Sequence, residues 1–176
     1  MNLPQKIVAL HHALAVAELP HAFGGALALA WCTGRARGTI DIDINIFAAV
    51  ERVEAVFAAL PPGVETEHKD RKIALRDGQV RLWWGRTPVD LFFNTTDFHV
   101  EAARRVRFET FMGERLPFLS CSDLAVFKAF FNRTQDWADL EQMVAAGTID
   151  VTAVTARIIE MLGVDDERVE KLGALA

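Results

Sequence analysis

Residues 23–47 read FGGALALAWCTGRARGTIDIDINIF. Two glycines are followed by a short apolar segment, a basic loop and the stretch Ile40–Ile46, in which isoleucine alternates with Asp41, Asp43 and Asn45. Because side chains point alternately to the two faces of a strand, this stretch predicts four isoleucines on one face and the acids on the other. The two aspartates would lie about 6.6 Å apart and repel each other unless a cation lies between them. The pattern therefore predicts a divalent-metal site.

Two other interpretations of this strand concern its polar face. An amphipathic edge strand with that face in water is the simpler alternative, although aspartate is depleted in strands. An EF-hand loop would need glycine and glutamate where Ile46 and Arg52 stand, so that interpretation is excluded.

The composition predicts a single domain, or one domain with a helical appendage, because the chain has 176 residues of which 51% are hydrophobic. A net charge of −5 argues against a general nucleic-acid binder but leaves room for a local basic patch. The acidic charge also makes a large RNA partner less favourable than for a basic protein.

The two cysteines and the apolar runs bear on the cellular compartment. Cys32 and Cys121 are too few for a disulfide framework, so we expect small core residues in a reducing cytosol. The longest uncharged apolar run, Ala22–Cys32, has eleven residues, whereas a membrane span needs about 20. We expect a cytoplasmic protein without a membrane partner.

The periodicity predicts an α+β fold, with a small mixed β-sheet flanked by helices over residues 1–119 and a C-terminal helical segment over residues 120–176 packed on it. The expected helices are 3–19, 26–32, 51–60, 97–106, 121–133, one that begins at Asp136, and 151–162. The expected strands are 21–23, 40–46, 64–67, 72–76, 79–84, 88–94, 107–112 and 115–119, with a hairpin turn at Asp77-Gly78.

A third acid lies within a later apolar strand. Asp90 is part of Val89-Asp90-Leu91-Phe92-Phe93, where a carboxylate needs a metal, a cation or several donors. One interpretation is a third ligand that points toward Asp41 and Asp43. The alternative is a strand-end acid that accepts hydrogen bonds from backbone amides.

Three basic residues lie near these motifs. Arg35 and Arg37 precede the acidic strand, and Lys128 lies at the edge of the apolar stripe of the helix 121–133. Each is either a neighbour of bound phosphates or a solvated charge, and Lys128 could also extend its ammonium out of an apolar surface into water.

The order of these motifs resembles the nucleotidyltransferase superfamily of the DNA polymerase β type. The resemblance rests on Phe23-Gly24-Gly25, on Thr39-x-Asp41-x-Asp43 and on Asp90 in a later strand. The C-terminal part is similar to minimal and abortive-infection (AbiEii-type) nucleotidyltransferases in the order Ser120, Asp123-Leu124, Lys128, Arg133, Asp136 and Asp139-Leu140.

The resemblance implies a transfer of a nucleoside monophosphate from a nucleoside triphosphate to a hydroxyl group. Asp41, Asp43 and Asp90 would be catalytic and would hold two Mg²⁺ (or Mn²⁺) ions. The residues implied in nucleotide binding are Gly24, Gly25, Thr39, Arg35, Arg37 and Lys128. The acceptor would be RNA, a protein or a small molecule, and an antitoxin partner is implied if the chain belongs to a toxin–antitoxin pair.

The same residues also fit two other functions. Ala26 and Leu27 stand where many members of the superfamily have a hydroxyl residue, which removes one phosphate contact. A catalytically degenerate protein of the same fold could bind a nucleotide or a partner without chemistry. A haloacid-dehalogenase-type phosphatase would use Asp41-x-Asp43, although Asn45 stands where that motif has threonine.

Overall fold

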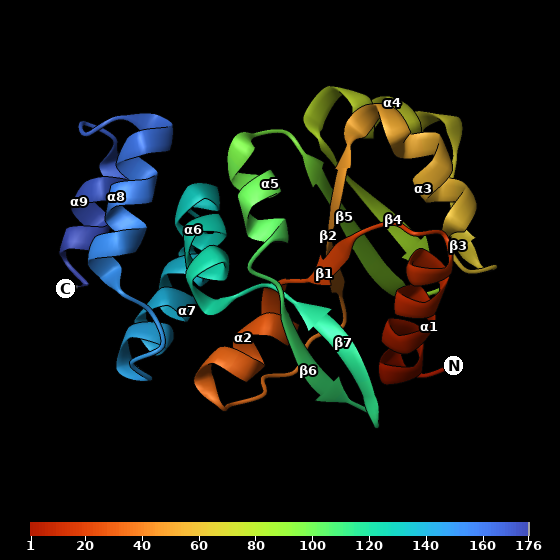
Figure 1. Cartoon of the computed structure of the whole chain (residues 1–176), viewed down its shortest axis with the longest axis horizontal. Coiled ribbons are helices and arrows are strands. Elements are labelled where there is room, and N and C mark those ends of the chain that lie inside the picture. Colours follow the sequence, from red (N-terminus) through yellow and green to blue (C-terminus); the bar gives the residue numbers. More distant parts are fainter. Residues whose placement is uncertain (176) are drawn as a thin grey trace. The chain divides into compact units, whose positions relative to one another are not determined.

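The computed structural model describes residues 1–175 and contains two compact units (Figure 1). The first unit comprises Met1–Leu27 with Gly38–Leu119, and the second comprises Ala28–Arg37 with Ser120–Ala176. Ala176, the last residue of the predicted C-terminal segment, lies outside the described residues. The division of the chain into domains at residue 119 stays a prediction.

The first unit is built on a mixed seven-stranded sheet, which confirms the predicted α+β class. Its strands are β1 (His21–Phe23), β2 (Ile42–Ala49), β3 (Val64–Glu65), β4 (Gln79–Trp84), β5 (Thr87–Asn94), β6 (Arg107–Phe111) and β7 (Glu114–Phe118). Its helices are α1 (Leu3–Val16), a 3₁₀ turn (Val50–Arg52), α3 (Val53–Ala59), α4 (His68–Asp77) and α5 (Asp97–Ala103).

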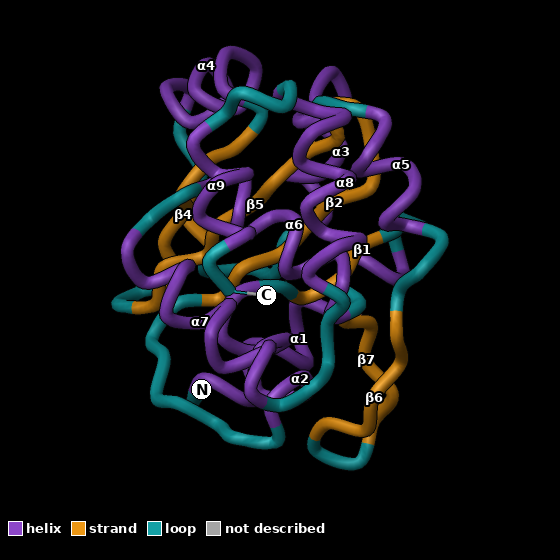
Figure 2. The backbone as a smooth tube through the Cα atoms, turned by 90° about the vertical axis from the view of Figure 1, so that its left-hand side faces the viewer, coloured by secondary structure: helices purple, strands orange, loops and turns teal. Residues whose placement is uncertain are grey.

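The strand order places the acidic strands at the centre of this sheet. The order is β3-β4-β5-β2-β1-β7-β6, and Figure 2 shows β4, β5, β2 and β1 side by side. The pairs β2–β5 and β1–β7 are parallel, whereas the other neighbouring pairs are antiparallel. The parallel pairing of β2 with β5 brings two of the predicted site residues together, as described below.

The apolar face of β2 forms part of the core. Ile42, Ile44 and Ile46 are fully buried, and Val89 and Leu91 of β5 lie opposite Ile42 and Ile44. The prediction of four isoleucines on one face is wrong by one residue. The strand begins at Ile42, and Ile40 lies in the preceding loop with 73% of its surface exposed.

The helix α4 replaces a predicted strand at residues 72–76. Its first turn is capped by the Asp70 carboxylate, which accepts a hydrogen bond of 2.7 Å from the Glu67 N–H. Gly78 ends it in the left-handed conformation at φ 69°. The turn predicted at Asp77-Gly78 is therefore a helix end, and the hairpin turn lies between Trp84 and Thr87. Residues 72–76 contain a short apolar run, Ile73-Ala74-Leu75, and a run of this length fits a helix as well as a strand, which explains the wrong prediction.

The second unit is helical in its described residues. It contains the last part of α2 (Gly25–Thr33), followed after Ser120 by α6 (Cys121–Phe131), α7 (Thr134–Ala145), α8 (Val151–Leu162) and α9 (Glu167–Gly173). Among residues 1–175, no helix has both the length and the apolar character that a membrane crossing requires.

A disulfide joins Cys32 of α2 to Cys121 of α6, with a Cα–Cα distance of 5.6 Å. Both cysteines are buried, as expected of small core residues. The expectation that they are not joined is wrong, because 89 residues of sequence separate two positions that the fold brings together. The bond links the α2 segment to α6 within the second unit.

We predict that Ile44→Ala lowers the free energy of unfolding by about 2–5 kcal/mol, because it leaves a cavity in a fully buried position of β2. Urea denaturation of both variants measures the effect. The matched control is Ile40→Ala, which should change the stability by no more than about 0.5 kcal/mol because Ile40 is exposed. Equal losses in the two variants would contradict the assignment of β2 to the core.

Candidate active site

The three predicted catalytic acids lie in the first unit, two of them on neighbouring strands of its sheet. Asp43 of β2 is directly opposite Asp90 of β5 in the parallel register. Neighbouring strands lie about 4.8 Å apart, so the register places Asp43 and Asp90 side by side. Asp41 lies just before β2, which begins at Ile42.

An arginine lies among these acids. Arg81 of β4 is directly opposite Asp90 in the antiparallel register. Its Nε and Nη2 donate hydrogen bonds of 2.7 and 2.6 Å to the two carboxylate oxygens of Asp90. Its Nη2 is also 4.0 Å from a carboxylate oxygen of Asp41. The guanidinium thus faces the acids as an internal cation, which the sequence analysis did not identify.

The surroundings of Arg81 differ from those of its partner. The Arg81 side chain is 53% exposed, whereas that of Asp90 is 13% exposed. The hydrogen bond to Asp90, and then the charges of Asp90, Asp41 and Asp43, raise the pKa of Arg81 above its usual value, although burial acts in the opposite direction. Arg81 is therefore charged at any physiological pH.

The glycine pair brings the backbone against Asp43. Gly24 donates its N–H to the Asp43 carbonyl at 2.9 Å. Gly25 begins α2 at φ 51°, and a Cβ on it would lie 1.8 Å from the Asp43 carboxylate oxygen Oδ2. A side chain at position 25 has no room beside that carboxylate. The predicted role of the glycines is nucleotide binding. In this structure the group that lies against Gly25 is the Asp43 carboxylate.

Thr39 acts on the other acid of the motif. Its hydroxyl donates a short hydrogen bond to the Asp41 carboxylate oxygen Oδ1. This contact orients Asp41 at the entry to the strand. The predicted role of Thr39 in nucleotide binding stays a prediction.

The acids fit a divalent cation in chemistry and partly in geometry. Carboxylate oxygens are the ligands that Mg²⁺ prefers, and the register of Asp43 and Asp90 places two of them side by side. Both oxygens of Asp90, however, are bound by Arg81. Among residues 1–175, no three acid, histidine or cysteine side chains are grouped as a complete metal centre. Asp41 and Asp43 thus fit as metal ligands, and Asp90 fits once Arg81 moves away.

Two of the predicted phosphate ligands meet in the second unit. Lys128 is buried, and its Nζ donates to Asp139 Oδ2 at 2.6 Å and lies 3.4 Å from Asp136 Oδ1. Arg37 Nη2 donates to the same Asp139 oxygen at 3.3 Å, and Gln135 donates to its other oxygen at 3.0 Å. The Lys128 ammonium is thus paired with two buried carboxylates within its own unit. Neither predicted phosphate contact is tested by these interactions.

Arg35 lies in the same unit but outside this network. It lines a cavity of about 160 Å³ together with Thr33, Gln142 and two alanines of α7 and its C-terminal end. Its backbone N–H donates to the Thr33 hydroxyl at 3.3 Å. Its predicted role beside phosphates also stays a prediction.

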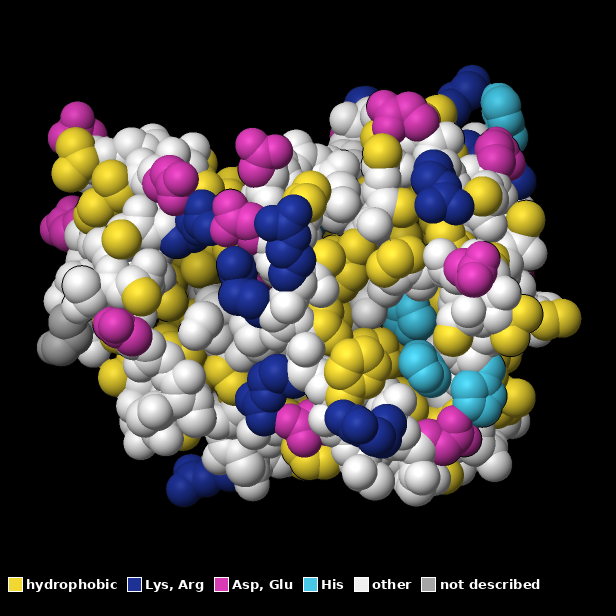
Figure 3. All heavy atoms as spheres, viewed as in Figure 1, with side chains coloured by type: hydrophobic (Ala, Val, Ile, Leu, Met, Phe, Trp, Pro, Cys, Tyr) yellow, Lys and Arg dark blue, Asp and Glu magenta, His cyan; other side chains and the backbone are white. Residues whose placement is uncertain are grey.

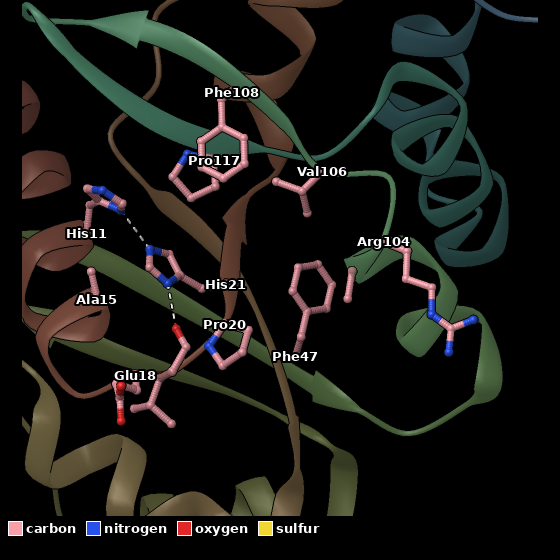
Figure 4. Close-up of a pocket in the computed structure, with 12 residues that line it drawn as sticks. His11, Ala15, Glu18, Pro20, His21, Phe47, Arg104, Val106, Phe108 and Pro117 are labelled. Carbon is pink, nitrogen blue, oxygen red and sulfur yellow. Dashed lines mark hydrogen bonds between the residues drawn. The ribbon is translucent and has the colours of Figure 1, made fainter.

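A second concave site in the first unit is a cavity of about 480 Å³ (Figure 4). Phe47, Phe108 and Pro117 supply apolar walls, and Figure 4 shows Glu18 and Arg104 on opposite sides of it. Figure 3 shows histidine side chains beside hydrophobic ones in this view of the surface. Phe47 lies near the end of β2 and Asp43 near its start, so the cavity and the acids are at different ends of the strand.

Two histidines of this cavity form a chain of hydrogen bonds. His21 Nδ1 is 2.8 Å from the Leu19 carbonyl and must donate to it, because a carbonyl only accepts. The His21 Nε2 of a neutral ring then accepts from His11 Nδ1 at 3.0 Å. Burial lowers the pKa of His21 to about 4, and burial followed by the nearby His12 lowers that of His11. Both rings are therefore neutral at pH 7.

Comparison with known proteins identifies the fold. No protein-family model matches the sequence, and no curated protein is significantly similar to it. The structure is similar to ANT(2'')-Ia in complex with adenylyl-2''-tobramycin, with a TM-score of 0.59 and 17% identity over 98% of each chain. It is also similar to the lincosamide antibiotic adenylyltransferase LnuA bound to lincomycin, with a TM-score of 0.56 and 13% identity over 81% of this chain and 96% of LnuA.

A third similar structure is an antigenic nucleotidyltransferase-like protein from Paracoccidioides brasiliensis. It has a TM-score of 0.56 and 14% identity over 98% of this chain and 92% of that protein. The chain thus has the nucleotidyltransferase fold, as the sequence motifs predicted. The likeness to abortive-infection nucleotidyltransferases stays a prediction.

We predict that Gly25→Ala destabilises the protein by more than Gly85→Ala. Both glycines have positive φ, at 51° and 59°, and each alanine pays about 1–2 kcal/mol for that conformation. A Cβ at Gly85 meets nothing within 4 Å, whereas one at Gly25 collides with Asp43. Overpacking should cost Gly25→Ala about 1–3 kcal/mol more. Urea denaturation measures both variants, and equal losses would refute the close approach at Asp43.

We predict that His21 remains neutral down to about pH 5, because its pKa in the folded chain is about 4 instead of 6.5. The unfolded chain binds more protons between these two values, so stability is complete above about pH 6.5 and is lost as the pH falls toward 4. The loss amounts to about 3 kcal/mol at 1.36 kcal/mol per pKa unit. NMR titration of the His21 ring measures this pKa. A midpoint near 6.5 would contradict the burial of His21 in its hydrogen-bonded position.

Proposed function

We propose that the protein is a Mg²⁺-dependent nucleotidyltransferase that moves a nucleoside monophosphate from a nucleoside triphosphate to a hydroxyl group of a small molecule. RNA and protein hydroxyls are the alternative acceptors. The observation that carries the proposal is the register of β2 and β5, which aligns Asp43 with Asp90 beside Asp41 in a nucleotidyltransferase fold.

The chain's own residues have distinct roles in this proposal. Asp41 and Asp43 would hold the divalent ion, and Asp90 would join them and accept the proton of the attacking hydroxyl. Bound Mg²⁺ would supply the positive charge that the entering and leaving oxygens require. Thr39 holds Asp41 in place through its hydroxyl. The N-terminus of α2, which begins at Gly25, would favour a bound anion through its N–H groups and dipole.

The transfer itself follows the chemistry of phosphoryl esters. The acceptor oxygen forms a bond to the α-phosphorus, the bond between that phosphorus and the bridging oxygen breaks, and pyrophosphate leaves with the electron pair. The hydroxyl proton passes to Asp90. Arg35, Arg37 and Lys128 remain the proposed partners of the leaving phosphates. Arg37 and Lys128 would have to be released from Asp139 for that role.

Similar structures support a small acceptor. ANT(2'')-Ia is bound to an adenylylated tobramycin, and LnuA is an adenylyltransferase bound to lincomycin. This chain matches nearly the whole length of both proteins, 98% and 96%. Its net charge of −5 also favours a small molecule over an RNA, which is bound mainly through phosphate contacts to Lys and Arg. ATP is accordingly the first nucleotide to test.

Two other functions follow from the same fold. A degenerate protein that binds nucleotide without transfer is favoured by one observation, the occupation of both Asp90 oxygens by Arg81. A toxin with a partner antitoxin rests on the motif resemblance, and growth arrest on expression, absent in Asp43→Asn, would support it. The dehalogenase-type phosphatase has no support in this fold.

We predict that ATP with Mg²⁺ raises the melting temperature, and that Asp41→Asn and Asp43→Asn abolish this shift. Ligand at about 100 times its dissociation constant adds roughly 2.7 kcal/mol, or about 5–11 °C for a chain of this size. Differential scanning fluorimetry measures the shift, and release of pyrophosphate with an aminoglycoside or lincosamide acceptor measures transfer.

The matched control for the charge change is Asp77→Asn, an exposed acid of α4 that pairs with Arg76 away from the site. It should retain the full shift. Nucleotide binding without pyrophosphate release from any acceptor would favour the degenerate protein. A wild-type chain that binds no nucleoside triphosphate with Mg²⁺ or Mn²⁺ would refute both functions.

A further inference from the structure

A guanidinium joins two of the three acids. Arg81 donates two hydrogen bonds to Asp90, and its Nη2 lies 4.0 Å from a carboxylate oxygen of Asp41. The hydrogen bond to Asp90, and then the charges of Asp90, Asp41 and Asp43, raise the pKa of Arg81. A divalent cation at these acids would therefore meet a positive charge that is already in place.

The geometry of this ion pair determines what a metal would meet. A carboxylate that accepts two parallel N–H bonds from one guanidinium directs both oxygens to that group. Both oxygens of Asp90 are therefore bound by Arg81. A cation can coordinate Asp90 only after at least one of these hydrogen bonds breaks. A positive charge close to the site also opposes the approach of a second one.

We propose that Arg81 and a divalent cation compete for Asp90, and that the nucleotide decides the competition by taking Arg81. This proposal rests on the proposed function, since it concerns the metal and nucleotide of that site. A phosphate group of the triphosphate, like the Asp90 carboxylate, offers the guanidinium two oxygens for a bidentate pair. Arg81 thereby becomes a positioning residue: it withholds the third acid from the metal until a nucleotide is bound, and it then contacts the phosphates.

Two features of Arg81 make the exchange feasible. More than half of its side chain is exposed, so the guanidinium can turn away from Asp90 into solvent without disturbing the core. A charged ligand can also offer the guanidinium the same two hydrogen bonds, so the pair lost with Asp90 is offset by the pair gained. The neighbours of Arg81 on β4, Val80 and Leu82, are buried and anchor the strand while the side chain moves.

The competing explanation is that Arg81 only pairs two strands. Opposite charges directly across an antiparallel pair stabilise a sheet slightly, and that role needs no ligand. The two explanations differ in what removal of the guanidinium does to metal binding. A strand-pairing residue leaves metal affinity unchanged or lowers it, whereas a competitor raises it.

The test is Mn²⁺ binding to the full chain, measured by electron paramagnetic resonance with and without a non-hydrolysable ATP analogue. Arg81→Gln should bind Mn²⁺ about tenfold more tightly than wild type without nucleotide, a typical coupling between two sites. The analogue should then raise its Mn²⁺ affinity by a smaller factor than in wild type. Arg81→Lys, which keeps the charge and loses the bidentate geometry, should lie between the two.

Arg76→Gln is the matched control. Arg76 makes an equivalent pair, with hydrogen bonds of 2.7 and 2.6 Å to the two oxygens of Asp77, and lies on α4 of the same unit. Its replacement changes the net charge equally and should leave Mn²⁺ binding at the wild-type value. Circular dichroism and urea denaturation of each variant establish that it is folded.

The outcomes separate this proposal from the proposed function. If wild type binds Mn²⁺ and the analogue but Arg81→Gln binds Mn²⁺ no more tightly than Arg76→Gln does, the competition is refuted and the proposed function stands. If neither wild type nor any variant binds Mn²⁺ or nucleotide, both are refuted. Tighter binding in Arg81→Gln with a reduced effect of the analogue supports the competition.

Discussion

The parallel pairing of β2 with β5 is the constraint on which the candidate site depends. It sets Asp43 opposite Asp90 and, through the same alternation, Ile42 and Ile44 opposite Val89 and Leu91 in the core. A shift by one residue would move the isoleucines to the polar face and bury the acids. The apolar core therefore enforces the position of the carboxylates, and the repulsion among them is tolerated because the opposite face fixes the register.

Charge is neutralised in different ways in the two units. In the second, the Lys128 ammonium is buried with Asp139, which is fully buried and accepts from three side chains. Breaking such a pair costs several kcal/mol, because it leaves an uncompensated charge without water. In the first unit, the Arg81 side chain is 53% exposed whereas that of its partner Asp90 is 13% exposed, so the guanidinium remains in contact with water while it exchanges one anion for another. A buried network suits a structural role, and an exposed guanidinium suits an exchange of partners.

Much of the fold was predictable because its signals are local. The alternation in β2, the glycines before α2 and the cap at Ser120, which accepts from the Asp123 N–H, are all readable over a few residues. The prediction of a strand at residues 72–76 was wrong because the segment's apolar run is short and the helix-capping signals that flank it, Asp70 and Gly78, were not considered. The disulfide could not be predicted, since it depends on how distant segments pack and not on local sequence.

The type and order of the three acids could be predicted from the sequence, but the arginine that pairs with one of them could not. The pairing of Arg81 with Asp90 follows from the turn between Trp84 and Thr87, because counting three residues back along β4 and three forward along β5 makes the two opposite. Strands at residues 79–84 and 88–94 were predicted without a pairing between them, so this register was missed. Since a charge opposite an acid changes what the acid can bind, the residue that pairs with Asp90 was missed as well. The position of a hairpin turn therefore determines which charged side chains lie opposite each other, as well as the topology of the sheet.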